Sequence, residues 1–308
     1  MNTRYLPTFL LIGAAKAGTT SLYDALGQHP EIYTSPIKEP SFFAFGGTRP
    51  DYQGPGDAAW LDRIVRDLDA YQALFRGRTT EKAAGEGSHW YLYSEKAPAY
   101  IRRYVPDVRL VAVLRDPADR AYSTYLHLRR TGQETLPSFE EALRQEAGRV
   151  AKGWGWGHYV RRGRYGEQLR RYYDHFRSEQ IRVYLYQDLQ RDPYGLLRDL
   201  YRFLGVRDDF VPDLSVHRNV SGLPKHPRLH RLLRASLPLY RYLRPLIPTD
   251  VRRAALRRYN RDLAKPPFPP ALRRQIIAQL RDDILQLQTL IDQDLGAWMH
   301  GENGELDT

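Results

Sequence analysis

The 308-residue sequence predicts an α/β fold: a three-layer sandwich in which helices cover both faces of a central, mostly parallel sheet. Two observations support this prediction. Short apolar runs such as Thr8–Gly13 and Val108–Arg115 are typical of strands that are buried on both faces. Such runs are followed by turn residues and then by segments with helical spacing, so strands and helices alternate along the chain.

The predicted strands are short and consist mostly of apolar or small residues. Four of them are Thr8–Gly13, Glu31–Thr34, Val108–Arg115 and Ile181–Tyr186. A fifth strand is predicted near Glu86, which lies where that strand passes into a loop. The predicted helices have apolar residues three and four positions apart, or begin and end at Pro, Thr or Gly. They are Thr19–Leu26, a stretch around Ala58–Phe75, Pro117–Arg130, Ser138–Arg149, Arg164–Phe176, Pro193–Gly205 and a last helix from Leu272 that ends near Trp298.

The composition excludes several classes of protein. With 42% hydrophobic and 27% charged residues, the chain is ordinary for a soluble globular protein. No apolar run approaches the roughly 18 residues of a membrane-spanning helix. The absence of cysteine excludes disulfides, cysteine metal sites and a thiol nucleophile. The first apolar run leads directly into a glycine loop and has no basic region before it, so we expect no signal peptide and a cytoplasmic location.

The net charge of +11 is concentrated in one segment. From Arg218 to Lys265 the chain has eleven Arg and two Lys against Asp250 and Asp262, and the rest is neutral. Such a segment attracts an acidic acceptor, a membrane surface or nucleic acid, although a set of solvated basic helices is the alternative. Five prolines interrupt it and exclude one long amphipathic helix.

The loop after the first strand is similar to a phosphate-binding loop. Gly13 and Gly18 have the spacing of the P-loop glycines, but Thr19 replaces the expected lysine, and Lys16 lies inside the loop. A strand–turn–helix of this kind can close backbone N–H groups around an anion at a helix N-terminus, and Thr19 and Thr20 add hydroxyl donors. A plain turn between strand and helix is the alternative interpretation.

The end of the second buried strand favours a second phosphate over a metal. Nucleotide-dependent kinases hold magnesium with an acidic residue at such a position. Here the strand ends in Arg115, which suits a phosphate group. Asp116 precedes Pro117 and is expected to cap the following helix.

The stretches KAGTTSL and VLRDPADRAYSTY resemble the two cofactor-binding motifs of the sulfotransferases that use 3′-phosphoadenosine-5′-phosphosulfate (PAPS), above all the bacterial and heparan-sulfate types. SPIKEPSFF, GEGSHWYLYS and the closing DLGAW agree, so the resemblance covers roughly residues 8–300. It implies a P-loop-like nucleotide-binding fold with extra C-terminal helices, PAPS as co-substrate, adenosine 3′,5′-bisphosphate (PAP) as product, and no metal. It also implies one domain over 1–308, with an α/β core at about 8–215 and a cofactor-covering loop and basic helices at about 216–300.

The resemblance also implies roles for individual residues. The loop that binds the 5′-phosphosulfate matches Lys16, Ala17, Gly18, Thr19, Thr20 and Ser21. Arg115 and Ser123 match the residues that bind the 3′-phosphate, and Lys225 lies in the late loop that often closes over the cofactor. Glu39 matches the general base of the heparan-sulfate type. Lys16 would neutralise charge that grows on the leaving phosphate oxygen without magnesium.

The acceptor side departs from the family pattern. Gly87 replaces a lysine found in many relatives, and Ser41 replaces a histidine found in one branch. His89 is the reserve candidate for the base, ahead of His127 and His158. Without the family pattern, Glu39 is a surface glutamate paired with Lys38.

Three functions therefore compete. The first is sulfuryl transfer from PAPS to an acceptor that is a glycan, a lipid-linked molecule or a secondary metabolite. The accepting group is expected to be a hydroxyl, with an amine as the less favoured choice. The alternatives are an ATP- and magnesium-dependent small-molecule kinase and a non-catalytic basic protein that binds nucleic acid or membrane. We expect a small-molecule or glycan acceptor and no nucleic-acid partner, with possible contact between the Arg218–Lys265 segment and a membrane or an acidic substrate. The oligomeric state stays open.

Overall fold

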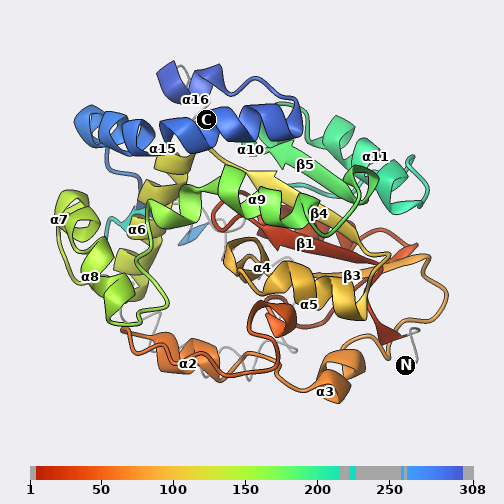
Figure 1. Cartoon of the computed structure of the whole chain (residues 1–308). Helices are drawn as coiled ribbons and strands as arrows, with labels where there is room; N and C mark the ends of the chain where they lie inside the picture. Colours follow the sequence, from red (N-terminus) through yellow and green to blue (C-terminus); the bar gives the residue numbers. More distant parts are fainter. Residues whose placement is uncertain (1–4, 216–221, 227–257, 260–261, 301–308) are drawn as a thin grey trace.

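The computed structural model describes residues 5–215, 222–226, 258–259 and 262–300. Its centre is a sheet of five parallel strands in the order β2-β3-β1-β4-β5. The strands are β1 Phe9–Gly13, β2 Ile32–Thr34, β3 Ala83–Gly87, β4 Arg109–Leu114 and β5 Ile181–Leu185. A ladder of two short strands, β6 Leu223–Pro224 and β7 Leu263–Ala264, stands apart from this sheet. The predicted α/β class is confirmed (Figure 1).

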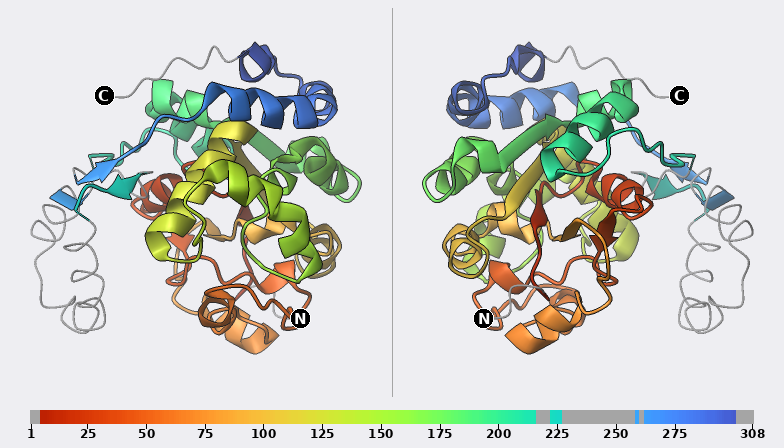
Figure 2. Two further views of the ribbon diagram at one scale, coloured as in Figure 1. Left: turned by 90° about the vertical axis from the view of Figure 1, so that its left-hand side faces the viewer. Right: turned by 90° about the vertical axis from the view of Figure 1, so that its right-hand side faces the viewer.

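Helices cover both faces of the sheet. Their bounds are α1 Thr19–Leu26, α2 Asp57–Leu61, α3 Leu68–Ala73, α4 Trp90–Tyr93, α5 Ala97–Tyr104, α6 Pro117–Thr131, α7 Phe139–Arg144, α8 Glu146–Ala151, α9 Tyr165–Tyr173, α10 Tyr186–Arg191, α11 Pro193–Leu204, α15 Pro270–Ile291 and α16 Gly296–His300. Figure 1 shows α4, α5 and α9 in front of the sheet, and Figure 2 shows α1 and α11 on the opposite face. Within the described residues, no helix is long and apolar enough to cross a membrane.

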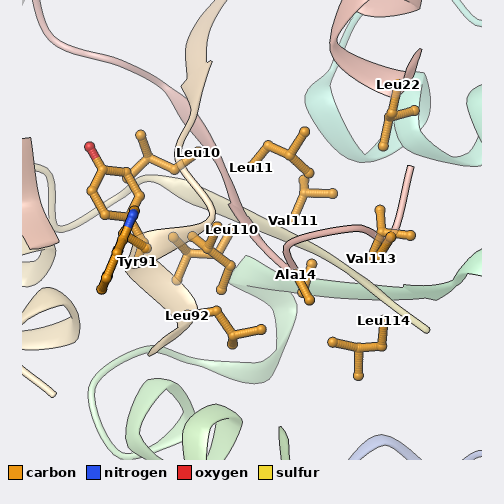
Figure 3. Close-up of a cluster of buried hydrophobic side chains, with 14 of the residues drawn as sticks. Leu10, Leu11, Ala14, Leu22, Tyr91, Leu92, Leu110, Val111, Val113 and Leu114 are labelled. Atoms are coloured by element: carbon orange, nitrogen blue, oxygen red, sulfur yellow. The ribbon is translucent and has the colours of Figure 1, made fainter. Parts of the chain in front are cut away.

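The core lies on both sides of β1 and β4. Because side chains alternate along a strand, Leu10 and Leu110 lie toward α4, whereas Leu11 and Val111 lie toward Leu22 of α1 (Figure 3). The two central strands are thus buried on both faces, as their apolar runs predict.

The C-terminal helix α15 packs across α9 and α6 and completes the layer in front of the sheet. Apolar residues three and four positions apart predicted this helix, and four of them are buried. They are Ile276, Leu280, Ile284 and Leu287. Removing these side chains from water stabilises the fold by about 1.5–3 kcal/mol each.

Three predicted helices are shorter than expected. The stretch around Ala58–Phe75 forms two helices because the Val65 N–H donates to the Pro40 carbonyl and Asp67 caps α3 through the Ala70 N–H. The predicted helix Ser138–Arg149 is divided at Gln145 into α7 and α8. The last helix ends at Ile291 because Asp292 is in the left-handed conformation, and Trp298 lies in α16. Most of the Arg218–Lys265 segment, with its predicted basic helices, lies outside the described residues.

Candidate active site

The loop between β1 and α1 is built to accept an anion. Gly18 is the N-cap of α1 with φ 81°, and no side chain caps this helix end. A Cβ at Gly18 would lie 2.9 Å from Leu189 Cδ2 and 3.1 Å from the Tyr186 ring, so α10 packs where only glycine fits. The first residues of α1 are Thr19, Thr20 and Ser21. Backbone N–H groups and hydroxyls thus lie at a helix N-terminus that no side chain caps, where the helix dipole favours negative charge.

Lys16 is surrounded by positive charge. It lies inside the loop in the left-handed conformation, with φ 65°. Arg115 follows the neighbouring strand β4, and its Nη1 donates to the Lys16 carbonyl at 3.4 Å. Burial, then Arg130, then Arg115 lower the pKa of Lys16 to about 7. These cations disfavour one another's charge, so a ligand that carries several negatively charged phosphates would stabilise the cluster. Arg130, on α6, was not among the residues predicted for the site.

Arg115 and Ser123, which were predicted to bind the second phosphate, lie after β4 and on α6. The Arg115 guanidinium lies 4.8 Å from the centre of the Tyr186 ring, and Ser123 is buried on α6. Asp116 Oδ1 accepts from the Ala118 and Asp119 N–H groups at 2.9 and 3.0 Å, and Oδ2 pairs with Arg273. The prediction that Asp116 caps α6 is confirmed.

Glu39 and His89 lie 50 positions apart in the sequence but form one unit. Glu39 Oε2 accepts from the His89 backbone N–H at 2.9 Å and lies 2.8 Å from His89 Nδ1. The second oxygen, Oε1, pairs with Lys38 at 2.6 Å. The Glu39 N–H donates to the Gly87 carbonyl at 2.9 Å, which ties the segment to the end of β3. The Glu39 side chain is 25% exposed.

The electrostatics of this pair favour an ionised carboxylate and a neutral imidazole. Burial raises the pKa of Glu39, but the contacts with His89 and Lys38 outweigh burial and hold that pKa below its usual range. Burial lowers the pKa of His89, more than its contact with Glu39 raises it. A neutral His89 that donates from Nδ1 holds the Glu39 carboxylate in place. The pairing with Lys38 expected of a surface glutamate is also present.

The other residues predicted for the site have contacts of their own. The pKa of His158 is lowered to about 3 by burial and by Arg162, and its Nδ1 lies 2.7 Å from the Tyr93 hydroxyl. His127 lies on α6 with its Nδ1 3.4 Å from Arg130 Nη2. Lys225 is exposed beside β6, which packs against α6, and its N–H donates to the Asp262 carbonyl at 2.8 Å.

The GWGWGHY stretch, residues 153–159, borders the Glu39–His89 pair. The Trp156 ring lies 5.9 Å from the His89 ring and 5.7 Å from the Trp90 ring. The Arg162 guanidinium lies 3.9 Å from the centre of Trp90 and 4.6 Å from that of Tyr93. The stretch is therefore packed on the molecule through its aromatic rings, and Trp156, which is partly exposed, lies beside His89.

The chain is similar to proteins that carry out sulfuryl transfer. Residues 7–210 match the model of the Sulfotransferase family. A crystal structure of a sulfotransferase from Alicyclobacillus acidocaldarius is 34% identical, with a TM-score of 0.76 over 95% of this chain and 98% of that one. Mouse heparan sulfate glucosamine 3-O-sulfotransferase 3B1 is 30% identical over 72% of this chain. Xenopus laevis bifunctional heparan sulfate N-deacetylase/N-sulfotransferase 1 is 29% identical over 71% of this chain.

The match covers 52% of the mouse protein and 24% of the Xenopus protein, so the chain corresponds to only part of these relatives. It corresponds to nearly all of the Alicyclobacillus structure. The family model covers most of the described α/β core, including the Lys16 loop, Arg115 and the Glu39–His89 pair. The chain belongs to the sulfotransferase family, as its KAGTTSL and VLRDPADRAYSTY motifs predict.

Proposed function

We propose that this protein transfers a sulfuryl group from PAPS to a hydroxyl of a glycan. The observation that carries the proposal is the gathering of Lys16, Arg115 and the Glu39–His89 pair. Lys16 and Arg115 follow β1 and β4, and His89 follows β3 and holds Glu39. Because β3, β1 and β4 are parallel neighbours, these groups share the carboxyl edge of the sheet, where ligands of open α/β folds bind.

The cation cluster would hold the co-substrate. The α1 N-terminus with Thr19 and Thr20 would bind the 5′-phosphate, and Arg115 with Ser123 the 3′-phosphate. Lys16 would stabilise the negative charge that develops on the bridging oxygen as the bond from sulfur to phosphate breaks. PAPS supplies the sulfuryl group, so these side chains bind and stabilise charge without forming a covalent intermediate.

Glu39 would remove the acceptor proton. As the acceptor oxygen forms its bond to sulfur, its proton passes to a Glu39 carboxylate oxygen, and PAP leaves with the electrons of the broken bond. His89 would hold Oε2 through its N–H groups, and Oε1 pairs with Lys38, whose side chain is 23% exposed. Lys38 can therefore move into solvent and yield Oε1 to the acceptor.

The acceptor class is supported by the surroundings of Glu39 and by the relatives. Trp156, which is partly exposed and lies beside His89, is an aromatic side chain of the kind on which sugar rings pack. The names of the mouse and Xenopus relatives state heparan sulfate as their substrate. A lipid-linked glycan or a hydroxylated metabolite would present the same acceptor chemistry, and an amine is the second candidate nucleophile.

Transfer is tested by incubating the protein with ³⁵S-labelled PAPS and an unsulfated heparan-type hexasaccharide. Two forms are compared, one N-acetylated and one with free amines. Label on the N-acetylated form supports a hydroxyl acceptor, and label on the free-amine form alone assigns an amine. If neither form is labelled, cell extracts of the source organism replace the hexasaccharide.

The nucleotide preference separates sulfuryl transfer from the kinase alternative. PAP is expected to raise the melting temperature equally in EDTA and in magnesium, because Lys16, Arg115 and Arg130 already supply positive charge. Differential scanning fluorimetry measures both conditions. Stabilisation by ATP that requires magnesium, without stabilisation by PAP, would support the kinase instead.

The affinity for PAP is expected to depend on pH through Lys16. In the free protein the pKa of Lys16 is lowered to about 7. A bound phosphate raises that pKa, because it favours the charged amine. Binding is therefore strongest below about pH 7 and weakens as pH rises above it, by up to about tenfold per pH unit. Isothermal titration calorimetry between pH 6 and 9 measures this slope, which Lys16→Arg should flatten because arginine stays charged.

A further inference from the structure

Glu86 is a carboxylate at the end of β3 with no exposed surface. Its Oε1 accepts from the Tyr91 and Tyr71 hydroxyls at 2.5 and 3.1 Å, and its Oε2 accepts from the Ser88 hydroxyl at 2.9 Å. Among the described residues, no Lys, Arg or His forms an ion pair with it. Three hydroxyl donors thus converge on one buried acceptor that the proposed transfer does not use.

Ser88 connects this carboxylate to the segment that carries Glu39. The Ser88 oxygen accepts from the Ser41 backbone N–H at 3.0 Å, so its hydrogen is available for Glu86. Ser41 and Ser88 have no exposed surface, and water cannot replace either bond from outside. Glu86 therefore fixes the orientation of the hydroxyl that holds Ser41.

The held segment is unusual in its backbone. Glu39 and Ser41 are both in the left-handed conformation, with φ 65° and 56°, although neither is glycine. Such conformations persist where the surroundings hold them. Three successive residues of the β3 end do so: Gly87 accepts from the Glu39 N–H, Ser88 accepts from the Ser41 N–H, and His89 donates to the Glu39 carboxylate.

We propose that Glu86 is a positioning residue that acts through Ser88, holding the Glu39–Ser41 segment so that the Glu39 carboxylate meets the acceptor. The proposal rests on the proposed function, in which Glu39 removes the acceptor proton. Glu86 itself lies beneath this segment and acts on the reaction through the hydrogen bonds of Ser88.

The variants Glu86→Gln and Ser88→Ala test this chain of bonds. A glutamine amide offers one acceptor oxygen to three hydroxyls, and alanine removes the acceptor of the Ser41 N–H. Each variant is expected to lower kcat roughly 10²-fold, the effect of a misplaced catalytic group, with the Kd for PAP unchanged. The double variant should be no slower than either single one. Tyr71→Phe is the matched control: it removes one donor to Glu86, leaves Ser88 bonded and should retain nearly full kcat.

NMR spectroscopy reports the position of the Glu39 carboxylate relative to His89 and does not require catalytic turnover. In ¹⁵N-histidine NMR spectra, the His89 Nδ1–H signal, assigned by its loss in His89→Asn, reports the hydrogen bond to Glu39. It should shift in Glu86→Gln and Ser88→Ala and stay in place in Tyr71→Phe. If Glu86→Gln does not fold, Ser88→Ala decides, because it leaves the carboxylate and its tyrosine donors intact.

The proposal is overturned if the folded variants keep the wild-type His89 signal and the wild-type kcat. A wild-type protein that transfers no sulfate to any acceptor contradicts the proposed function instead. In that case the NMR shifts still report whether Glu86 positions the Glu39–His89 pair.

Discussion

Replacing Glu39 with glutamine is expected to lower kcat for sulfate transfer by about 10²–10⁴-fold, the usual contribution of a general base. Glutamine has nearly the same shape and can still accept from the His89 N–H groups, so the segment should keep its position. It cannot take a proton from the acceptor. Initial rates with saturating ³⁵S-labelled PAPS and the hexasaccharide measure the loss.

Two controls separate proton removal from a general loss of structure. Glu39→Gln should bind PAP with wild-type affinity, because Lys16 and Arg115 follow other strands than the one that holds Glu39. His89→Asn should lose less activity than Glu39→Gln, and the double variant should be no slower than Glu39→Gln, because His89 only orients the carboxylate. Full activity in Glu39→Gln combined with an inactive His89→Asn would transfer the role of base to His89.

Lys16→Ala is the second large expected effect. Removal of a charge that stabilises the leaving phosphate oxygen should lower kcat by about 10²–10³-fold. The same change should not reduce the melting temperature of the ligand-free protein, and should raise it slightly. The reason is that Lys16 is buried among Arg130 and Arg115, which disfavour its charge. Rate measurements at saturating PAPS and thermal unfolding without ligand test both statements.

Lys16→Arg is the matched control for charge, since it retains a cation in the loop. It should recover part of the affinity for PAP but less of kcat, because a planar guanidinium does not present the compact charge of an ammonium group. Wild-type turnover in Lys16→Ala would contradict the role of Lys16 in stabilising the leaving group.

The strand, loop and helix that carry Lys16 could be predicted because local features specify them. Apolar runs define β1 and β4, and Gly18 fits the left-handed N-cap that the loop requires. Arg115 was predicted as the second phosphate ligand because it ends a buried strand where kinases carry an acidic residue, and because it matches the residue that binds the 3′-phosphate in the family it resembles. In the structure the Arg115 guanidinium donates to the Lys16 carbonyl, so the two residues lie side by side.

The contact between Glu39 and His89 could not be predicted from local features. It depends on left-handed backbone at Glu39 and Ser41, which neither residue type favours. It also depends on the pairing of β2 with β3, which brings residues far apart in the sequence together. Arg130 could not be predicted for a similar reason. A basic residue in the last turn of a helix is common on solvated surfaces, and only the direction of α6 brings Arg130 near Lys16.

The ion pair between Arg273 and Asp116 has a consequence for the boundaries of the folding unit. Asp116 caps α6 directly after Arg115, and Arg273 belongs to α15, which lies beyond residues 7–210 that carry the family signature. A fragment trimmed to the signature would expose the apolar faces of α9 and α6 that α15 covers, and would leave the buried Asp116 carboxylate without its cation. The folding unit therefore extends beyond the residues that match the family model, because α15 is needed to cover α9 and α6 and to pair with Asp116.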